Sequence, residues 1–141
     1  MTAPLLVGVY KNSILTKQYA TDERTSEILP KIFKEIDEKY AIKSLFFAKG
    51  PGSFMSIKIS YIFLKSYSIV KNIPLKAVDG FYFNNNSPIK SIGKMFFIKD
   101  GDNIILDTIK ESKLTMFKLP EVLKKDDFSL NSTPLYILPA V

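Results

Sequence analysis

Residues 48–54 read Ala-Lys-Gly-Pro-Gly-Ser-Phe and connect a short apolar run with a long stretch rich in Ile, Tyr, Phe and Leu. This order is typical of a β-strand followed by a tight turn and a helix. Gly50 and Gly52 can adopt positive φ, Pro51 fixes one turn residue, and Ser53 can cap the helix. Backbone N–H groups at such a turn can bind an anion, so Gly50, Gly52 and Ser53 are candidate phosphate-binding residues. The alternative is a turn that requires glycine for structural reasons alone, and no Walker A Gly-Lys-Ser/Thr follows it.

The composition of the 141-residue chain excludes several classes of active site. An apolar share of 46% suffices for the core of one domain, or of one domain with a small appendage. Histidine and cysteine are both absent, which removes Ser-His-Asp and Cys-His catalysis, zinc sites built from those residues, and disulfide bonds. The net charge is +6, and every basic residue except Arg24 is a lysine. Because phosphate and nucleic-acid sites favour arginine, we interpret this charge as solvated surface, with weak attraction to RNA as the alternative.

Nothing in the sequence predicts a membrane segment or an exported protein. No apolar run reaches the roughly 20 residues of a membrane span. The first four residues lack the basic region of a signal peptide. We therefore expect a cytoplasmic protein.

The first half of the sequence alternates between predicted strands and helices. Residues 5–10 and 14–20 read as two strands joined by a hairpin turn. Apolar side chains then recur at the spacing of one helix face. Because Pro30 is tolerated only in a first turn, we place the start of this helix at 26–29, and it should end before Ile42. A strand at 43–48, a helix at 53–71 and a strand at 75–78 are expected to follow.

The second half reads as short strands after a loop. The loop at 84–88 has no periodicity and separates two predicted domains, 1–83 and 84–141. Because strands alternate with crossover helices in the first half, we predict parallel neighbours within a three-layer α/β fold that has a mixed sheet, an antiparallel edge and two main helices. Further strands are expected at 94–99, 103–109, 114–119 and 135–138, with a hairpin turn at 100–102.

The helix at 53–71 is apolar on almost its whole circumference. One stripe consists of Phe54, Ile57, Tyr61 and Leu64, and other Ile, Phe and Val residues fill much of the remainder. Such a helix must be covered on both sides. One side can face the sheet. The other is covered either by the first helix or by another protein, and the sequence leaves this open.

The acidic residues form no recognisable catalytic or metal-binding motif. Glu35, Asp37 and Glu38 fall on the polar side of the first helix, and the acids of the turn at 100–102 suit a turn without a ligand. Asp79 stands at the end of a predicted strand, where ligands of parallel sheets gather. We expect no catalytic residue, no metal and no cofactor.

Two segments and their spacing resemble the bacterial TsaB (YeaZ) proteins, which take part in making threonylcarbamoyladenosine on tRNA. They are residues 25–30, Thr-Ser-Glu-Ile-Leu-Pro, and residues 48–54 with their Gly-Pro-Gly-Ser-Phe core. The family pattern is roughly His-Ser-Glu-x-Leu-Leu-Pro, followed by Gly-x-Gly-Pro-Gly-Ser-Phe-Thr-Gly-Leu-Arg-Ile-Gly. A helix ending at 72–74 and a strand follow in the expected places, so the resemblance covers about residues 5–80.

This resemblance implies a ribonuclease-H-like half-domain of the actin/Hsp70-like ATPase superfamily that has become a scaffold, with 84–141 as a reduced second part. It implies a catalytic TsaD-type partner bound through the two helices. A TsaE-type ATPase would join the pair, and tRNA would be contacted at most indirectly. The partner surface would consist of nine apolar residues: Ile28, Leu29, Ile32, Phe33, Ile36, Phe54, Ile57, Tyr61 and Leu64.

The sequence also departs from the family pattern. Met55 and Ser56 stand in place of Thr-Gly, Lys58 in place of Arg, and Ser60 in place of Gly. The family's first strand, with its Ile-Asp-Thr-Ser phosphate segment, has no counterpart in the sequence. Without that Asp there is no evident way to hold a metal–nucleotide complex, so the glycine turn would be a vestigial phosphate site.

Three hypotheses follow. The chain is a non-catalytic scaffold, or a small nucleotide-binding enzyme that uses the turn at 50–54 as a phosphate cradle, or a self-associating domain whose helices pair across a two-fold axis.

Overall fold

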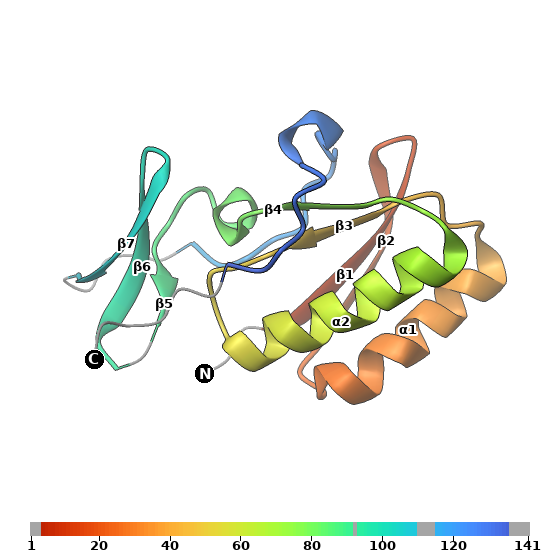
Figure 1. The fold of residues 1–141 in the computed structure, drawn as a ribbon, viewed down its shortest axis with the longest axis horizontal. Coiled ribbons are helices and arrows are strands. Elements are labelled where there is room, and N and C mark those ends of the chain that lie inside the picture. Colours follow the sequence, from red (N-terminus) through yellow and green to blue (C-terminus); the bar gives the residue numbers. More distant parts are fainter. Residues whose placement is uncertain (1–3, 92, 110–114, 136–141) are drawn as a thin grey trace.

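Two helices lie side by side on one face of a set of strands in the computed structural model, which describes residues 4–91, 93–109 and 115–135 (Figure 1). The first part runs β1 (Leu5–Lys11), β2 (Ile14–Thr21), α1 (Thr25–Lys39), β3 (Leu45–Ala48), α2 (Phe54–Lys71) and β4 (Leu75–Val78). The second part contains a 3₁₀ helix (Gly80–Phe83), β5 (Ile89–Lys90), β6 (Met95–Asp100), β7 (Asn103–Thr108) and a second 3₁₀ helix (Lys125–Asp127). The predicted α/β class is confirmed.

The main core lies between the two helices and the parallel pair β3–β4. Apolar residues at alternate positions of β3 point toward the helices, as the period of two in a strand requires. Phe33 of α1 contacts Phe63 and Tyr67 of α2 edge to face, with ring centroids 5.1 and 5.3 Å apart. The buried members of this core are Leu29, Phe33, Leu45, Phe47, Leu64, Leu75 and Ala77.

The strands form three small sheets. β1 and β2 pair as an antiparallel hairpin, and β3 pairs with β4 in parallel through the crossover helix α2, as the sequence predicts. Both pairs pack against the same core, since Leu5 and Val7 of β1 contact it as well. Among the described residues, β1 and β3 are not hydrogen-bonded to each other.

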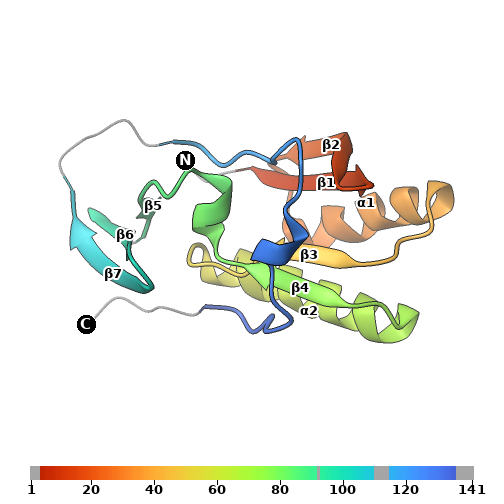
Figure 2. The same ribbon diagram turned by 90° about the horizontal axis from the view of Figure 1, so that it is seen from above.

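The face of the strands opposite the helices is covered by an irregular part of the chain, residues 115–135 (Figures 1 and 2). Phe128 packs edge to face on Phe46 of β3, with ring centroids 5.1 Å apart. Ser129 and Ala77 exchange two backbone hydrogen bonds of 2.8 Å along the edge of β4. The third layer therefore comes from the end of the described chain and contains no α-helix.

The second part has a smaller core of its own. β5, β6 and β7 form an antiparallel sheet, with a turn after Asp100 as expected. Phe81, Ile89 and Phe97 are buried in it, and the half-buried Phe117 packs against them. Phe81 precedes the predicted domain boundary and yet packs with the second part, while the division at residue 84 stays a prediction.

Four details of the secondary structure differ from the prediction or lie outside the described residues. The helix α1 begins at Thr25, so Pro30 is its sixth residue. The N–H that Pro30 lacks would bond only to the carbonyl of Ser26 in the first turn, so the helix loses one hydrogen bond near its start. Residues 115–119 form no strand, and β5 was not predicted. Of the strand expected at 135–138, only Leu135 is described, and it is not in a strand.

The burial of α2 predicts that alanine substitutions at two nearby positions, Leu64 and Ile62, lower the free energy of unfolding by very different amounts. Leu64 is 7% exposed in the core, whereas Ile62 is 53% exposed. We expect Leu64→Ala to lower the free energy of unfolding by about 3 kcal/mol, through lost burial and a cavity. Ile62→Ala should change it by less than about 1 kcal/mol. Urea unfolding of both variants tests this, and equal losses would contradict the orientation of α2.

Candidate partner-binding surface

The glycine turn is fixed by the chain's own backbone. Gly50 has φ of +100° and is buried, and its carbonyl accepts a hydrogen bond of 2.8 Å from the N–H of Gly80. Lys49 donates its N–H to the carbonyl of Val78 at 2.9 Å and accepts one from the N–H of Leu135 at 2.7 Å. These groups join the turn to the end of β4 and to the end of the described chain, so they are not available to a ligand.

The two glycines of the turn have different roles. A Cβ atom on Gly50 would lie 2.9 Å from Cδ1 of Ile57 and 3.1 Å from the carbonyl oxygen of Leu135. Gly52 has no positive φ, and its nearest neighbour would be Cδ1 of Ile57 at 3.6 Å. Only Gly50 therefore requires glycine. Ser53 occupies the N-cap position of α2, but its side chain makes no capping hydrogen bond.

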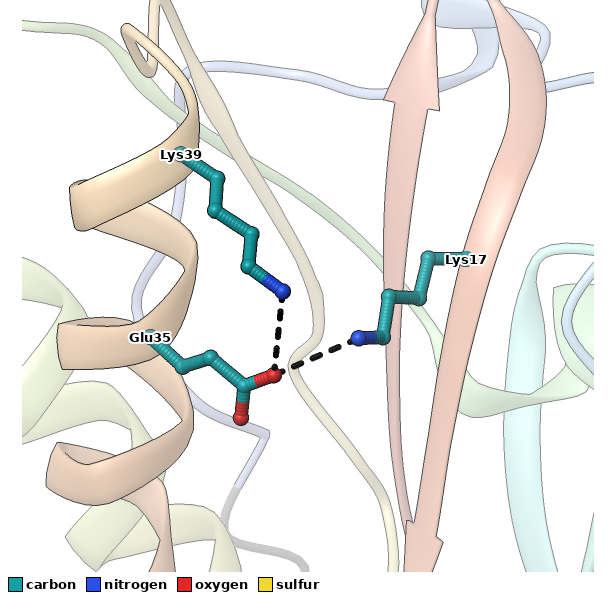
Figure 3. Close-up of polar contacts among 3 residues, drawn as sticks. All are labelled: Lys17, Glu35 and Lys39. Carbon is teal, nitrogen blue, oxygen red and sulfur yellow. Dashed lines mark hydrogen bonds and ion pairs between the residues drawn. The ribbon is translucent and has the colours of Figure 1, made fainter.

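Two acidic residues of the first helix, Glu35 and Asp37, pair with lysines or a tyrosine. One carboxylate oxygen of Glu35 lies 3.3 Å from Nζ of Lys17 on β2 and 3.6 Å from Nζ of Lys39 (Figure 3). The hydrogen bond from Lys17 lowers the pKa of Glu35. Asp37 accepts a hydrogen bond of 2.8 Å from the hydroxyl of Tyr67 and lies 3.4 Å from Nζ of Lys71. These carboxylates connect α1 to its neighbours and do not converge on a cleft.

Asp79 lies at the carboxyl end of β4, as predicted, and forms an ion pair with a lysine. Its carboxylate lies 2.7 Å from Nζ of Lys99 on β6, and both side chains are half-buried. This pair ties the first part of the chain to the second. Among the described residues there is no group of three or more carboxylates that could hold a metal ion.

The structure buries most of the nine residues predicted to form the partner surface. Leu29, Ile32, Phe33, Ile36 and Leu64 are 3–8% exposed and face the strands or the neighbouring helix. Ile28, Ile57 and Tyr61 are half-buried, and Tyr61 stacks on Phe47 of β3. Only Phe54 is well exposed, at 44%. The prediction chose the inner face of each helix because a regular apolar stripe is what marks a core face.

A different apolar surface of α2 faces outward. Met55, Ile62, Ile69 and Val70 are 53–80% exposed and project from the side of the helix opposite the core. We call the exposed residues Met55, Ile62, Ile69 and Val70, with the half-buried Ile59 between them, the outer stripe. The alternative that α2 keeps an exposed apolar face after packing in its own domain is therefore confirmed.

The outer stripe continues into a groove between the two helices. The groove is lined by Thr25, Ser26, Leu29 and Pro30 of α1 and by Ile59, Ile62, Phe63 and Ser66 of α2. Apart from three hydroxyl groups, its side chains are apolar. A groove of this kind suits a helix of another protein. The spacing of positions 55, 59, 62, 66 and 69 could have predicted this surface from the sequence. It does not stand out, because apolar residues occur on almost every side of α2.

Comparisons with known proteins identify the fold. No family model and no curated protein matches the sequence. Among solved structures, the chain is similar to YeaZ from Pseudomonas aeruginosa, with 13% identity, a TM-score of 0.47, and 73% of this chain and 55% of that chain covered. It is also similar to an uncharacterized protein described as similar to peptidase YeaZ from Pseudomonas aeruginosa, with 12% identity, a TM-score of 0.50, and coverage of 84% and 65%.

The chain therefore has a YeaZ (TsaB)-like fold, which confirms the resemblance noted in the sequence. It spans 55–65% of the length of these structures. In the described part of the chain, no helix is both long and apolar enough to span a membrane.

The glycine turn gives a matched pair of variants. We expect Gly50→Ala to destabilise the protein by about 1–3 kcal/mol, because alanine would be strained at this φ and would clash with Ile57. Gly52→Ala should stay within about 0.5 kcal/mol. Thermal unfolding followed by circular dichroism measures both. A tolerated Gly50→Ala would contradict the geometry of the turn.

The contact between Tyr67 and Asp37 predicts a loss of stability in alkali. Burial, and then the hydrogen bond to Asp37, raise the pKa of Tyr67 from 10.0 to about 12. Because the folded protein holds this proton more tightly than the unfolded chain, its contribution is complete below pH 10 and is lost as the pH rises toward 12.

Tyr67→Phe has no hydroxyl at this position and should lack the stabilisation that depends on its proton. The difference in the free energy of unfolding between the wild-type protein and Tyr67→Phe should therefore shrink as the pH rises above 10. Urea unfolding at several pH values measures it, and absorbance titration of tyrosinate checks the pKa directly. Tyr10, whose pKa burial also raises to about 12, is present in both proteins and cancels. A constant difference across this range would contradict the assignment.

Proposed function

We propose that this protein is a non-catalytic scaffold subunit of the machinery that makes threonylcarbamoyladenosine on tRNA. In this role it binds and supports a catalytic TsaD-type subunit, and a TsaE-type ATPase joins the pair. The observation that carries the proposal is the outer stripe: an exposed apolar helix face on a YeaZ-like fold.

The magnitude of the exposed apolar area supports a binding role. Each aliphatic side chain of the outer stripe would contribute roughly 1.5–3 kcal/mol if a partner buried it fully. Monomeric proteins rarely expose such residues as a contiguous patch. A partner that covers Met55, Ile62, Ile69 and Val70 together would remove this patch from water.

A role without chemistry of its own agrees with the side chains present. The sequence contains no histidine or cysteine. Glu35, Asp37 and Asp79 are all engaged with lysines. At the turn, the N–H of Lys49 and the carbonyls of Lys49 and Gly50 are hydrogen-bonded within the chain. In the proposed complex the tRNA contacts other subunits, and this chain needs no cofactor.

Co-purification tests the proposal. The tagged chain should capture the TsaD-type subunit of the same organism when the two are co-expressed. Ile62→Asp should abolish capture, because it places a charge in the centre of the outer stripe. Leu130→Asp is the matched control, since Leu130 is 70% exposed in the irregular segment on the other face.

Failure of the wild-type chain to capture the subunit would overturn the proposed function. Capture that survives Ile62→Asp would keep the function and overturn the assigned surface. Calorimetry with ATP and Mg²⁺ addresses the competing enzyme hypothesis. Binding that is lost in Gly50→Ala and retained in Ile62→Asp would favour a nucleotide site at the turn.

A further inference from the structure

We propose that the strand layer contains a site for one further β-strand, between β1 and β3, and that its occupant is an extended apolar segment of a second polypeptide. This segment runs antiparallel to β1 and parallel to β3, and it joins the two strand pairs into one sheet. The site is independent of the proposed function and of the outer stripe. The observation behind it is a set of backbone groups that lack a partner in the described part of the chain.

The facing edges of β1 and β3 are unpaired. Both strands pack against the same core, and they run in opposite directions in one layer (Figures 1 and 2). Each is hydrogen-bonded on its far side only, β1 to β2 and β3 to β4. Among the described residues, the two facing edges form no backbone hydrogen bond with each other or with another segment. The sheet is therefore interrupted between two strands that share one core.

The hydrogen bonds of β3 show which of its backbone groups face β1. The N–H groups of Leu45 and Lys49 bond to carbonyls on the β4 side, at 2.9 Å each. Successive residues of a strand direct their N–H and C=O groups to opposite edges. The N–H and C=O groups of Phe46 and Ala48 therefore face β1, and in the described chain they have no backbone partner.

The backbone of β1 is directed toward β3 in the same way. On the outer edge of β2, the N–H of Leu15 bonds to the carbonyl of Glu121, so Leu15 turns its backbone groups away from β1. Its partner in the hairpin register is Tyr10, which therefore directs its own N–H and C=O groups away from β2. The irregularity of the hairpin adds a residue to β2 and none to β1. By alternation along β1, Gly8 and Leu6 face β3 as well.

The strand layer is covered on both faces at this point. The two helices cover one face through the main core. On the other face, the hydroxyl of Tyr10 donates a hydrogen bond to the carbonyl of Pro120, and Phe128 packs on Phe46. Backbone N–H and C=O groups inside a covered layer are almost always paired. The facing edges of β1 and β3 therefore require a partner.

The sequence of β1 is that of an interior strand. Residues 5–10 are aliphatic, aromatic or glycine, whereas β2 has Lys17 and Gln18 at its centre. A strand that is apolar on both faces is typical of the inside of a sheet, with a neighbour on each edge. Yet residues 5–10 are only half-buried. A strand inserted beside β1 would cover them further.

The pairing that the site requires excludes a helix and a strand of a second copy. An inserted strand pairs along both of its edges and lies about 4.8 Å from each neighbour. Each described strand already has a paired edge, so no described strand of a second copy can be inserted without losing its own pairing. A helix uses its backbone groups internally and cannot pair with a strand edge.

The segments of this chain outside the described residues do not suit the site by their sequences. Residues 1–3 are too few to span β1, and residues 110–114 are mostly charged. Residues 136–141 contain Pro139, which has no N–H to donate in the middle of a sheet. An extended segment of a second polypeptide that is apolar on both faces meets all the requirements.

Titration of the chain with a synthetic peptide tests the site. The probe is Lys-Val-Ile-Val-Ile-Val-Lys, with lysines for solubility. Two matched controls carry N-methyl groups at alternate residues, so each can pair along one edge only. The unmodified peptide should bind, and both controls should bind at least about tenfold more weakly, because each loses its hydrogen bonds to β1 or to β3.

Two results of this titration would overturn the inference. If one methylated control bound as tightly as the unmodified peptide, the peptide would be pairing with a single edge. If the unmodified peptide did not bind, the facing edges would not form a site for a strand.

Amide hydrogen exchange locates the bound peptide. In the free chain, the N–H groups of Leu6, Gly8 and Phe46 should exchange at least about tenfold faster than those of Val7 and Phe47, which face β2 and β4. The probe should remove this difference. Val7 and Phe47 are the controls, since they lie in the same strands and should not change. Equal exchange of both sets in the free chain, or a difference that the probe leaves unchanged, would overturn the site.

Two measurements examine the source of the strand. Removal of residues 136–141 should leave the Kd of the probe unchanged, and a lower Kd would show that this segment competes for the site, which would overturn the second polypeptide. Intact mass of the protein from its native organism compares the other source. An additional apolar strand before Met1 would keep the site and overturn the second polypeptide as its source, and the absence of such a strand would support the proposal.

Discussion

The packing of two helices against the parallel strands β3 and β4 is the constraint on which the rest of the structure depends. Leu29 and Phe33 of α1 and Leu64 of α2 meet Leu45 and Phe47 of β3 in one core. A parallel strand pair requires a crossover helix, and the glycine turn begins it. Once Leu64 faces the strands, the helical period fixes where every other residue of α2 points. The outward direction of Met55, Ile62 and Ile69 is therefore a consequence of the core.

The glycine turn has the strand–turn–helix order of an anion site, but its backbone also forms hydrogen bonds to other parts of the chain. Strand, turn and helix follow one another as in a phosphate-binding loop. Yet the backbone groups of Lys49 and Gly50 bond to Val78, Gly80 and Leu135. Gly50 is needed because its φ is +100° and because a Cβ atom there would lie close to Ile57 and Leu135. The turn thus serves to position α2 against β3 and to hold the end of the described chain.

The distribution of charge divides the molecule's surface into two regions. Around α1 and β2, lysines are balanced by Glu35 and Asp37. Along the outer side of α2 there is no such balance, and apolar side chains stand beside Lys58 and Lys65. An apolar strip with an uncompensated positive flank combines burial, which gives affinity, with charge, which gives selectivity.

The sequence by itself determined the order of strands and helices in the first part, the parallel pairing of β3 and β4, and the hairpins, because periodicity and turn residues are local signals. The YeaZ-like class came from the resemblance of two motifs, residues 25–30 and 48–54. It could not determine which face of α2 is covered, since a helix that is apolar all round has no periodic contrast to read. The predicted partner surface accordingly included Leu29, Phe33 and Leu64, which are core residues. Only the tertiary structure decided that residues 115–135 cover the face of the strands opposite the helices, that Asp79 meets Lys99, and that Met55, Ile62 and Ile69 remain in water. These outcomes depend on contacts between residues far apart in the chain, which no local pattern encodes.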